Sequence, residues 1–123
     1  MKYARVERER RFLLRELPPD LPAAWKLVTD WYFSGTRLRL RSIETPDGEV
    51  IARKLTQNYC EPNQSPAKTT ITNFYLNDEE FDRLRLLGGN QLKKMRYAYE
   101  LATGDFVIDV FEGPLSGLIL AEI

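Results

Sequence analysis

The sequence contains no histidine and a single cysteine among its 123 residues. Without histidine, Ser-His-Asp and Cys-His triads, histidine zinc sites and imidazole acid/base chemistry are all excluded. The lone Cys60 cannot form an internal disulfide. Any catalysis must therefore use carboxylates, lysine, arginine, tyrosine or a hard metal ion.

The chain also lacks net charge, long apolar runs and a known glycine-rich phosphate loop. Its 18 basic and 18 acidic residues cancel, so no global field attracts nucleic acid or an anionic membrane, and neither DNA nor a membrane is expected as a partner. No apolar run approaches the length of a bilayer span and the N-terminus is charged, which predicts a soluble cytoplasmic protein. There is no GxxxxGK[ST] motif, and Gly88-Gly89 is not part of a GxGxxG motif. A site for a polyanion would have to be local.

Length and pattern predict one domain, 1–123, that is mostly β. Alternation and β-branched or aromatic content predict strands at 6–16, 31–43, 50–59, 69–76, 91–99, 106–111 and 118–123. For the first of these a helix is the alternative, because Glu and Arg are good helix formers.

Asp47-Gly48 predicts a hairpin turn and 60–67 a loop. Asn77 can cap a helix over 79–87, and a second short helix is plausible over 22–30. The expected fold class is α+β, mainly antiparallel β, with one or two short helices.

Charged residues occupy alternate positions in three of the predicted strands. They are Glu7, Glu9 and Arg11; Arg37, Arg39 and Arg41; and Lys94 and Arg96. A period of two places each set on one face of its strand. One interpretation is a solvated sheet face whose other side packs on the core. The recurrence favours a second one, a basic lining, which is costly unless a polyanion or interleaved carboxylates neutralise it.

Phosphate is the anion that suits such a lining, because arginine engages it through a bidentate fork and lysine as a point charge. Glu7 and Glu9 project the same way about 7 Å apart, a spacing that could share Mg²⁺ or Mn²⁺ together with phosphate oxygens. The aromatic residues at 74, 75, 97, 99, 106 and 111 are expected in the core, because alternate strand positions must fill the interior.

Motifs along the whole chain resemble the CYTH domain, the triphosphate tunnel metalloenzyme family. In order they are Glu7-x-Glu9-x-Arg11-Phe12, Arg37-x-Arg39-x-Arg41, Leu55-Thr56, Lys94-x-Arg96-Tyr97, Ile108-Asp109-Val110-Phe111 and Gly117-Leu118 to Ala121-Glu122. The opening motif of the family is ExExK, and Arg11 stands at its lysine. The ordered set is specific, whereas ExExR alone is weak.

The resemblance implies an antiparallel β-barrel tunnel in which basic residues bind a triphosphate and glutamates hold Mg²⁺ or Mn²⁺. Its implied phosphate contacts are Arg11, Arg37, Arg39, Arg41, Lys94 and Arg96. Its implied metal ligands are Glu7, Glu9 and Glu122, and Glu7, Glu9 and Arg11 would be catalytic. The implied function is metal-dependent hydrolysis of inorganic triphosphate or of a nucleoside or other organic triphosphate.

Three departures from the family keep other functions open. Asn58 stands where the family usually has a lysine after the Leu-Thr pair, and residues 69–74 contain no carboxylate where many members have an acidic pair. The sequence ends at Ile123, where the family continues, so we expect an incomplete barrel with an open edge that a second copy of the chain could cover, as a homodimer. A non-catalytic polyphosphate- or nucleotide-binding module is the alternative function, and a small oligomeric domain with mutually paired charges is a third.

Overall fold

The computed structural model describes residues 4–60, 62–63 and 68–123. Within them the chain forms one antiparallel sheet of nine strands, one α-helix and one 3-10 helix. The strands are β1 (Ala4–Arg8), β2 (Arg11–Leu13), β3 (Lys26–Tyr32), β4 (Leu38–Glu44), β5 (Val50–Tyr59), β6 (Lys68–Tyr75), β7 (Asn90–Leu101), β8 (Gly104–Phe111) and β9 (Ile119–Glu122). Helix α1 spans Asp78–Arg85 and the 3-10 helix spans Gly113–Leu115. The expected fold class is confirmed; residues 61 and 64–67 of the predicted loop lie outside the described residues.

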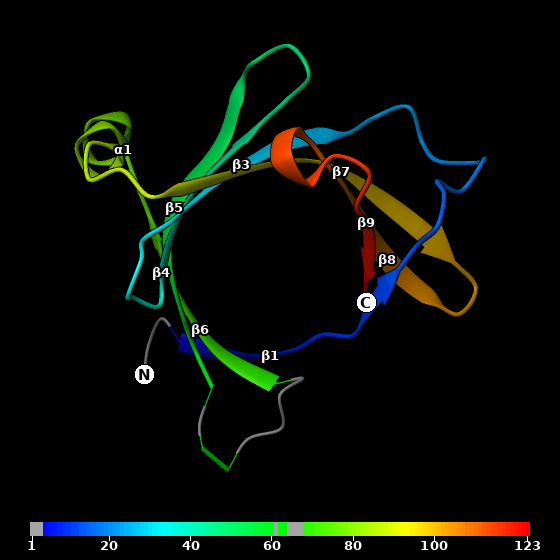
Figure 1. Ribbon diagram of the computed structural model, residues 1–123, viewed down its shortest axis with the longest axis horizontal. Helices are drawn as coiled ribbons and strands as arrows, with labels where there is room; N and C mark the ends of the chain where they lie inside the picture. The colour runs from blue at the N-terminus through cyan, green and yellow to red at the C-terminus, as the bar shows by residue number, and fades with distance from the viewer. Residues whose placement is uncertain (1–3, 61, 64–67) are drawn as a thin grey trace.

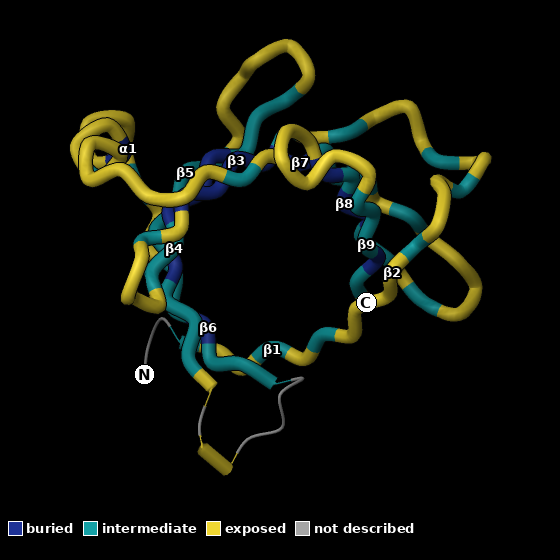
Figure 2. The backbone as a smooth tube through the Cα atoms, in the orientation of Figure 1, coloured by how far each residue is buried: buried dark blue, intermediate teal, exposed yellow. Residues whose placement is uncertain are grey.

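The sheet curls into a ring because two strands that are consecutive in sequence lie at its opposite edges (Figures 1 and 2). The strand order is β1-β6-β5-β4-β3-β7-β8-β9-β2, and only Glu9 and Arg10 separate β1 from β2. The amide of Arg10 donates to the carbonyl of Ile123 at 3.1 Å, and the amide of Ile123 donates back to Arg10 at 3.0 Å. Strand β9 pairs with β8 on one side and β2 on the other. The N-terminal segment therefore covers the edge that was expected to be open after Ile123.

Three predicted boundaries need correction. The helix expected over 22–30 is wrong, because strand β3 pairs on both sides, with β4 and β7, and this pairing overrides local helix preference. The strand expected over 31–43 is interrupted by a turn at Gly35, which has a φ of 75°, and the carbonyl of Phe33 accepts from the amide of Thr36 at 3.1 Å. The strand expected over 6–16 divides at Glu9-Arg10, where the chain crosses between the two sheet edges.

The hairpin and the first helix are confirmed. Gly48 adopts a φ of 86° between β4 and β5, and its amide donates to the carbonyl of Thr45 at 2.9 Å. Asn77 caps α1 through a capping box: its side chain accepts from the amide of Glu80 at 2.8 Å, and Glu80 accepts from the amide of Asn77 at 2.9 Å.

Among the described residues, no helix has both the length and the apolar character needed to cross a membrane.

An apolar cluster lies between the helix and the outer face of the ring. Trp31, Leu40 and Phe81 are buried there, and the rings of Trp31 and Phe81 meet edge to face with centroids 5.6 Å apart. The expectation that all the strand aromatics are in the core is wrong for Phe74 and Tyr75, which are 54% and 72% exposed. Packing α1 on the outside leaves the inward face of the strands free to carry polar groups.

Candidate functional site

The ring encloses a polar cavity of about 770 Å³. Alternate residues of most strands point into it, as the period of two requires. The lining residues are Arg5, Glu7, Glu9, Arg11, Tyr32, Arg39, Arg41, Lys54, Asn58, Thr69, Ile71, Asn73, Lys94, Arg96 and Glu122. Residues from the three charged sets of the sequence therefore meet around one space.

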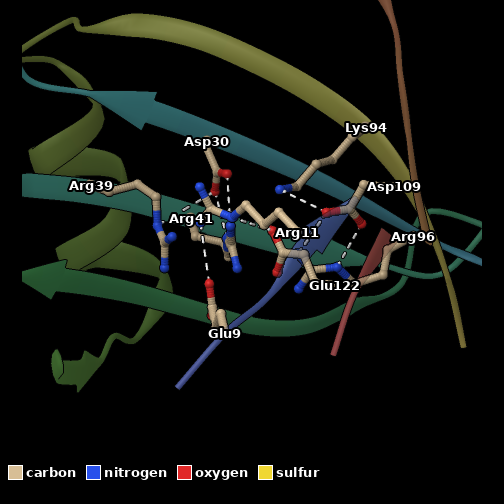
Figure 3. A network of polar contacts seen from close by, with 9 residues as sticks. All are labelled: Glu9, Arg11, Asp30, Arg39, Arg41, Lys94, Arg96, Asp109 and Glu122. Atoms are coloured by element: carbon tan, nitrogen blue, oxygen red, sulfur yellow. Dashed lines mark hydrogen bonds and ion pairs between the residues drawn. The ribbon is translucent and has the colours of Figure 1, made fainter. Parts of the chain in front are cut away.

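Asp30 anchors the arginines of β4 (Figure 3). Its carboxylate is fully buried and accepts two hydrogen bonds from Arg41, at 2.6 Å from Nε and 2.8 Å from Nη2. Arg39 lies farther away, with Nε 3.8 Å from the same carboxylate, and its Nη2 donates to Thr56 Oγ1 at 3.3 Å. The Thr56 hydroxyl in turn donates to Asn73 at 2.6 Å. These contacts fix the two guanidinium groups in place before any ligand binds.

Asp109 plays the same part for the cations of β7. Its buried carboxylate accepts from Arg96 at 2.9 and 3.0 Å and forms an ion pair with Lys94 at 3.0 Å. Burial lowers the pKa of Lys94 although Asp109 opposes the change. Burial acts against Arg96 too, but the hydrogen bonds and charge of Asp109, together with the charges of Glu122 and Asp30, outweigh burial and raise the pKa of Arg96.

The acidic residues of the N-terminal segment and of β9 are also paired with arginine. Arg11 contacts Glu9 at 3.2 Å and Glu122 at 3.0 Å, while Arg5 contacts Glu7 at 2.7 Å. Two carboxylates thus meet at one guanidinium, and a divalent cation needs only one or two carboxylates when a phosphate supplies further oxygens. Glu7 does not extend this pair: no group of three or more potential metal-binding side chains occurs within residues 4–60, 62–63 and 68–123.

Most of the residues predicted from the sequence line this cavity, with one difference. The cavity lining includes Glu7, Glu9, Arg11, Arg39, Arg41, Lys94, Arg96 and Glu122 but not Arg37. The guanidinium of Arg37 instead lies over the ring of Tyr59, 4.8 Å from its centroid. The roles of these residues in binding phosphate or metal stay predictions.

Three residues of the site, Asp30, Arg5 and Lys54, were not predicted from the sequence. Asp30 was not identified because it fell within the helix predicted over 22–30, although it alternates with Val28 and Tyr32 as a strand residue would. Lys54 belongs to a comparable alternation with Thr56 and Asn58, and this pattern could have identified it.

Comparison with known proteins finds the same architecture in solved structures. A structure described as the hypothetical protein NE1496 matches with a TM-score of 0.57 and 26% identity, over 93% of this chain and 72% of that one. A second, described as the inorganic triphosphatase NE1496, matches with a TM-score of 0.56 and 25% identity, over 93% of this chain and 69% of that one. No family model and no curated protein matches the sequence.

Proposed function

Because the chain has the CYTH-type fold of the triphosphate tunnel metalloenzymes, we propose that it binds and hydrolyses a triphosphate inside its ring, with Mg²⁺ or Mn²⁺. The observation that carries the proposal is the basic cavity enclosed by the curled sheet. A structural neighbour described as an inorganic triphosphatase supports it. The likeness supports a triphosphate-hydrolysing role at the level of the fold, and the metal and the substrate are part of the proposal.

The chain's own residues bind and orient the phosphates. Arg39 and Arg41 contribute from β4, Lys94 and Arg96 from β7, and Arg11 from the N-terminal segment. Because Asp30 and Asp109 already hold several of these groups, little reorganisation is needed when charge shifts during the reaction. Fixing the triphosphate also keeps its terminal phosphorus in one position for attack.

Hydrolysis consumes one water molecule. The water oxygen adds to the terminal phosphorus, the bond from that phosphorus to the bridging oxygen breaks, and the bridging oxygen leaves on the diphosphate. The proton lost by the water passes to the products and solvent. Glu9 and Glu122 would hold the divalent cation, which would neutralise phosphate charge and orient the attacking water.

The proposal is tested by assaying phosphate release from inorganic triphosphate and from ATP, with Mg²⁺ or Mn²⁺ and with chelator. We expect metal-dependent turnover that falls about 100-fold or more in Glu9→Ala. Glu16→Ala, which changes an exposed glutamate outside the cavity, should retain native turnover. Equal turnover in Glu9→Ala and the native chain would contradict the assignment of Glu9.

A non-catalytic polyphosphate-binding module is the second candidate. Glu9 and Glu122 are both ion-paired with Arg11, and the cavity-facing residues of β6, Thr69, Ile71 and Asn73, carry no charge. Calorimetry would detect salt-sensitive binding of triphosphate without turnover if this candidate is right.

A further inference from the structure

Lys54 is a cation in the cavity that no motif of the sequence identified. It lies in β5, directly opposite Arg41 of β4 in the sheet register, and on the same face of its strand as Thr56 and Asn58. Its side chain is half-buried and lines the cavity. It therefore faces the same space as the arginines that have carboxylate partners.

Counting the charges around the cavity shows an excess of positive charge. Seven cations line it: Arg5, Arg11, Arg39, Arg41, Lys54, Lys94 and Arg96. Five carboxylates line or underlie it: Glu7, Glu9, Glu122, Asp30 and Asp109. Two positive charges are therefore left uncompensated by the described residues.

The contacts locate this excess on the neighbouring strands β4 and β5. Among the described residues, Lys54 has neither an ion pair nor a hydrogen bond from its side chain. The ion pair of Arg39 is long, with its Nε 3.8 Å from Asp30 Oδ1, and both oxygens of Asp30 already accept hydrogen bonds from Arg41. The Nε of Arg39 is also buried without a hydrogen-bond partner. A lone pair from a ligand would satisfy it.

The surroundings of Lys54 disfavour its positively charged form. Burial lowers its pKa first, and the charges of Arg41, Arg39, Arg96 and Arg5 lower it further. From β6, the register partner of Lys54 is Tyr75, an exposed residue that brings no carboxylate to offset them. Either Lys54 gives up its proton readily, or an anion in the cavity compensates its charge.

We propose that Lys54 and Arg39 form a subsite for a doubly charged phosphate group, the unsubstituted terminal phosphate of the ligand. Arg39, Arg41 and Lys54 face a single carboxylate, Asp30, so the β4–β5 side has an excess of two positive charges. This excess matches a group that carries nearly two negative charges at neutral pH. The subsite rests on the proposed function, and it assigns the terminal phosphate to the β4–β5 side of the cavity. The remaining phosphates then face the cations of β7 and the N-terminal segment.

Binding of inorganic triphosphate, measured by calorimetry without metal, tests the subsite. Lys54→Met removes the charge and keeps the length of the side chain, so we expect about 10-fold to 100-fold weaker binding. Lys54→Arg keeps the charge and should bind within about threefold of the native chain. Lys93→Met, which alters an exposed lysine outside the cavity, should bind as the native chain does.

Proton uptake gives a readout that a merely structural role would not change. The free protein has a lowered Lys54 pKa, and a bound phosphate raises it, so binding should take up a proton at pH values between the two. Calorimetry in buffers of different ionisation enthalpy measures this uptake. It should be present in the native chain and diminished in Lys54→Met, and native affinity should fall as pH rises above the pKa of free Lys54.

The outcomes separate this inference from the proposed function. If Lys54→Met binds triphosphate with the same affinity and the same proton uptake as the native chain, the Lys54 subsite alone is overturned. A native chain that binds no triphosphate, either without metal or with Mg²⁺ or Mn²⁺ added, overturns the proposed function, and the subsite with it. Urea unfolding of each variant shows whether it is folded. A folded Lys54→Arg variant that binds triphosphate as weakly as Lys54→Met would also overturn the subsite, because the positive charge would then not be the cause of binding.

Discussion

Buried aspartates hold the cavity arginines and lysine in position. Asp30 and Asp109 are both fully inaccessible to solvent, yet each carries a charge that two cations share. Removing one member of such a group costs more than the group itself contributes, because it leaves a buried charge without compensation. These two carboxylates therefore matter for stability as well as for positioning.

Asp109→Asn should lower the free energy of unfolding by about 3 kcal/mol or more, because Lys94 and Arg96 would lose their shared counter-charge. Urea unfolding measures the change. Asp105→Asn, an exposed substitution in the same strand, should change stability by less than about 0.5 kcal/mol. Similar losses in both variants would show that the buried ion pairs are not the cause.

The same carboxylate should make stability depend on acidic pH. Burial alone would raise the pKa of Asp109, but the hydrogen bonds and charge of Arg96, with Lys94, outweigh burial and hold that pKa below its usual range. The stabilisation is therefore present above the unfolded-state pKa of about 3.9 and is lost as pH falls through the folded-state pKa. We expect the stability difference between the native chain and Asp109→Asn to narrow below about pH 4 in urea unfolding. A difference that stays constant there would contradict this linkage.

Helix α1 is the element that stabilises the β3–β4 wall from outside. Phe81 is 2% exposed, contacts Trp31 and lies under the guanidinium of Arg53, 4.2 Å from its ring centroid. Strand β4 thus has an apolar side facing the helix and a basic side facing the cavity. Its two faces separate the core from the site.

Phe81→Ala should destabilise the protein by about 3–5 kcal/mol, because it removes a buried ring from the centre of the apolar cluster. Loss of the edge-to-face contact should also change the fluorescence of Trp31. Leu86→Ala, at a residue that is 86% exposed just after the helix, serves as the control and should have little effect on stability. An equal effect of both substitutions in urea unfolding would show that α1 does not pack as described.

At the scale of the whole molecule, the N-terminal segment closes the ring. Strand β1 covers the edge of β6 and strand β2 covers the edge of β9. The same short segment places Glu7, Glu9 and Arg11 at the cavity. Closure and assembly of the site therefore depend on the same residues.

Deleting residues 1–13 should expose two unpaired strand edges, and such edges template pairing between chains. We expect self-association of the truncated chain, detected by light scattering after size-exclusion chromatography. A synthetic peptide of residues 4–13 should restore the smaller species by pairing with β6 and β9. A truncated chain that is folded and remains monomeric would contradict the role of this segment in protecting the edges.

The sequence by itself determined part of the local structure and the kinds of groups in the site. Period-two alternation predicted that Arg39 and Arg41 share one face of a strand and that Lys94 and Arg96 share a face of another. Asp47-Gly48 predicted the hairpin, and Asn77 predicted the start of the helix. These signals are visible because each depends on residues close together in the chain. The resemblance to a known family supplied the expectation of a tunnel, and the fold confirms it.

Only the tertiary structure decided how the ring closes and which charges compensate one another. The pairing of β2 with β9 joins residues more than a hundred positions apart, and Asp30 meets Arg41 only because β3 is a strand held between β4 and β7. Likewise, whether Lys54 has a partner depends on every strand that faces it. Electrostatic compensation is a property of distances in space, and the order of residues along the chain does not specify those distances.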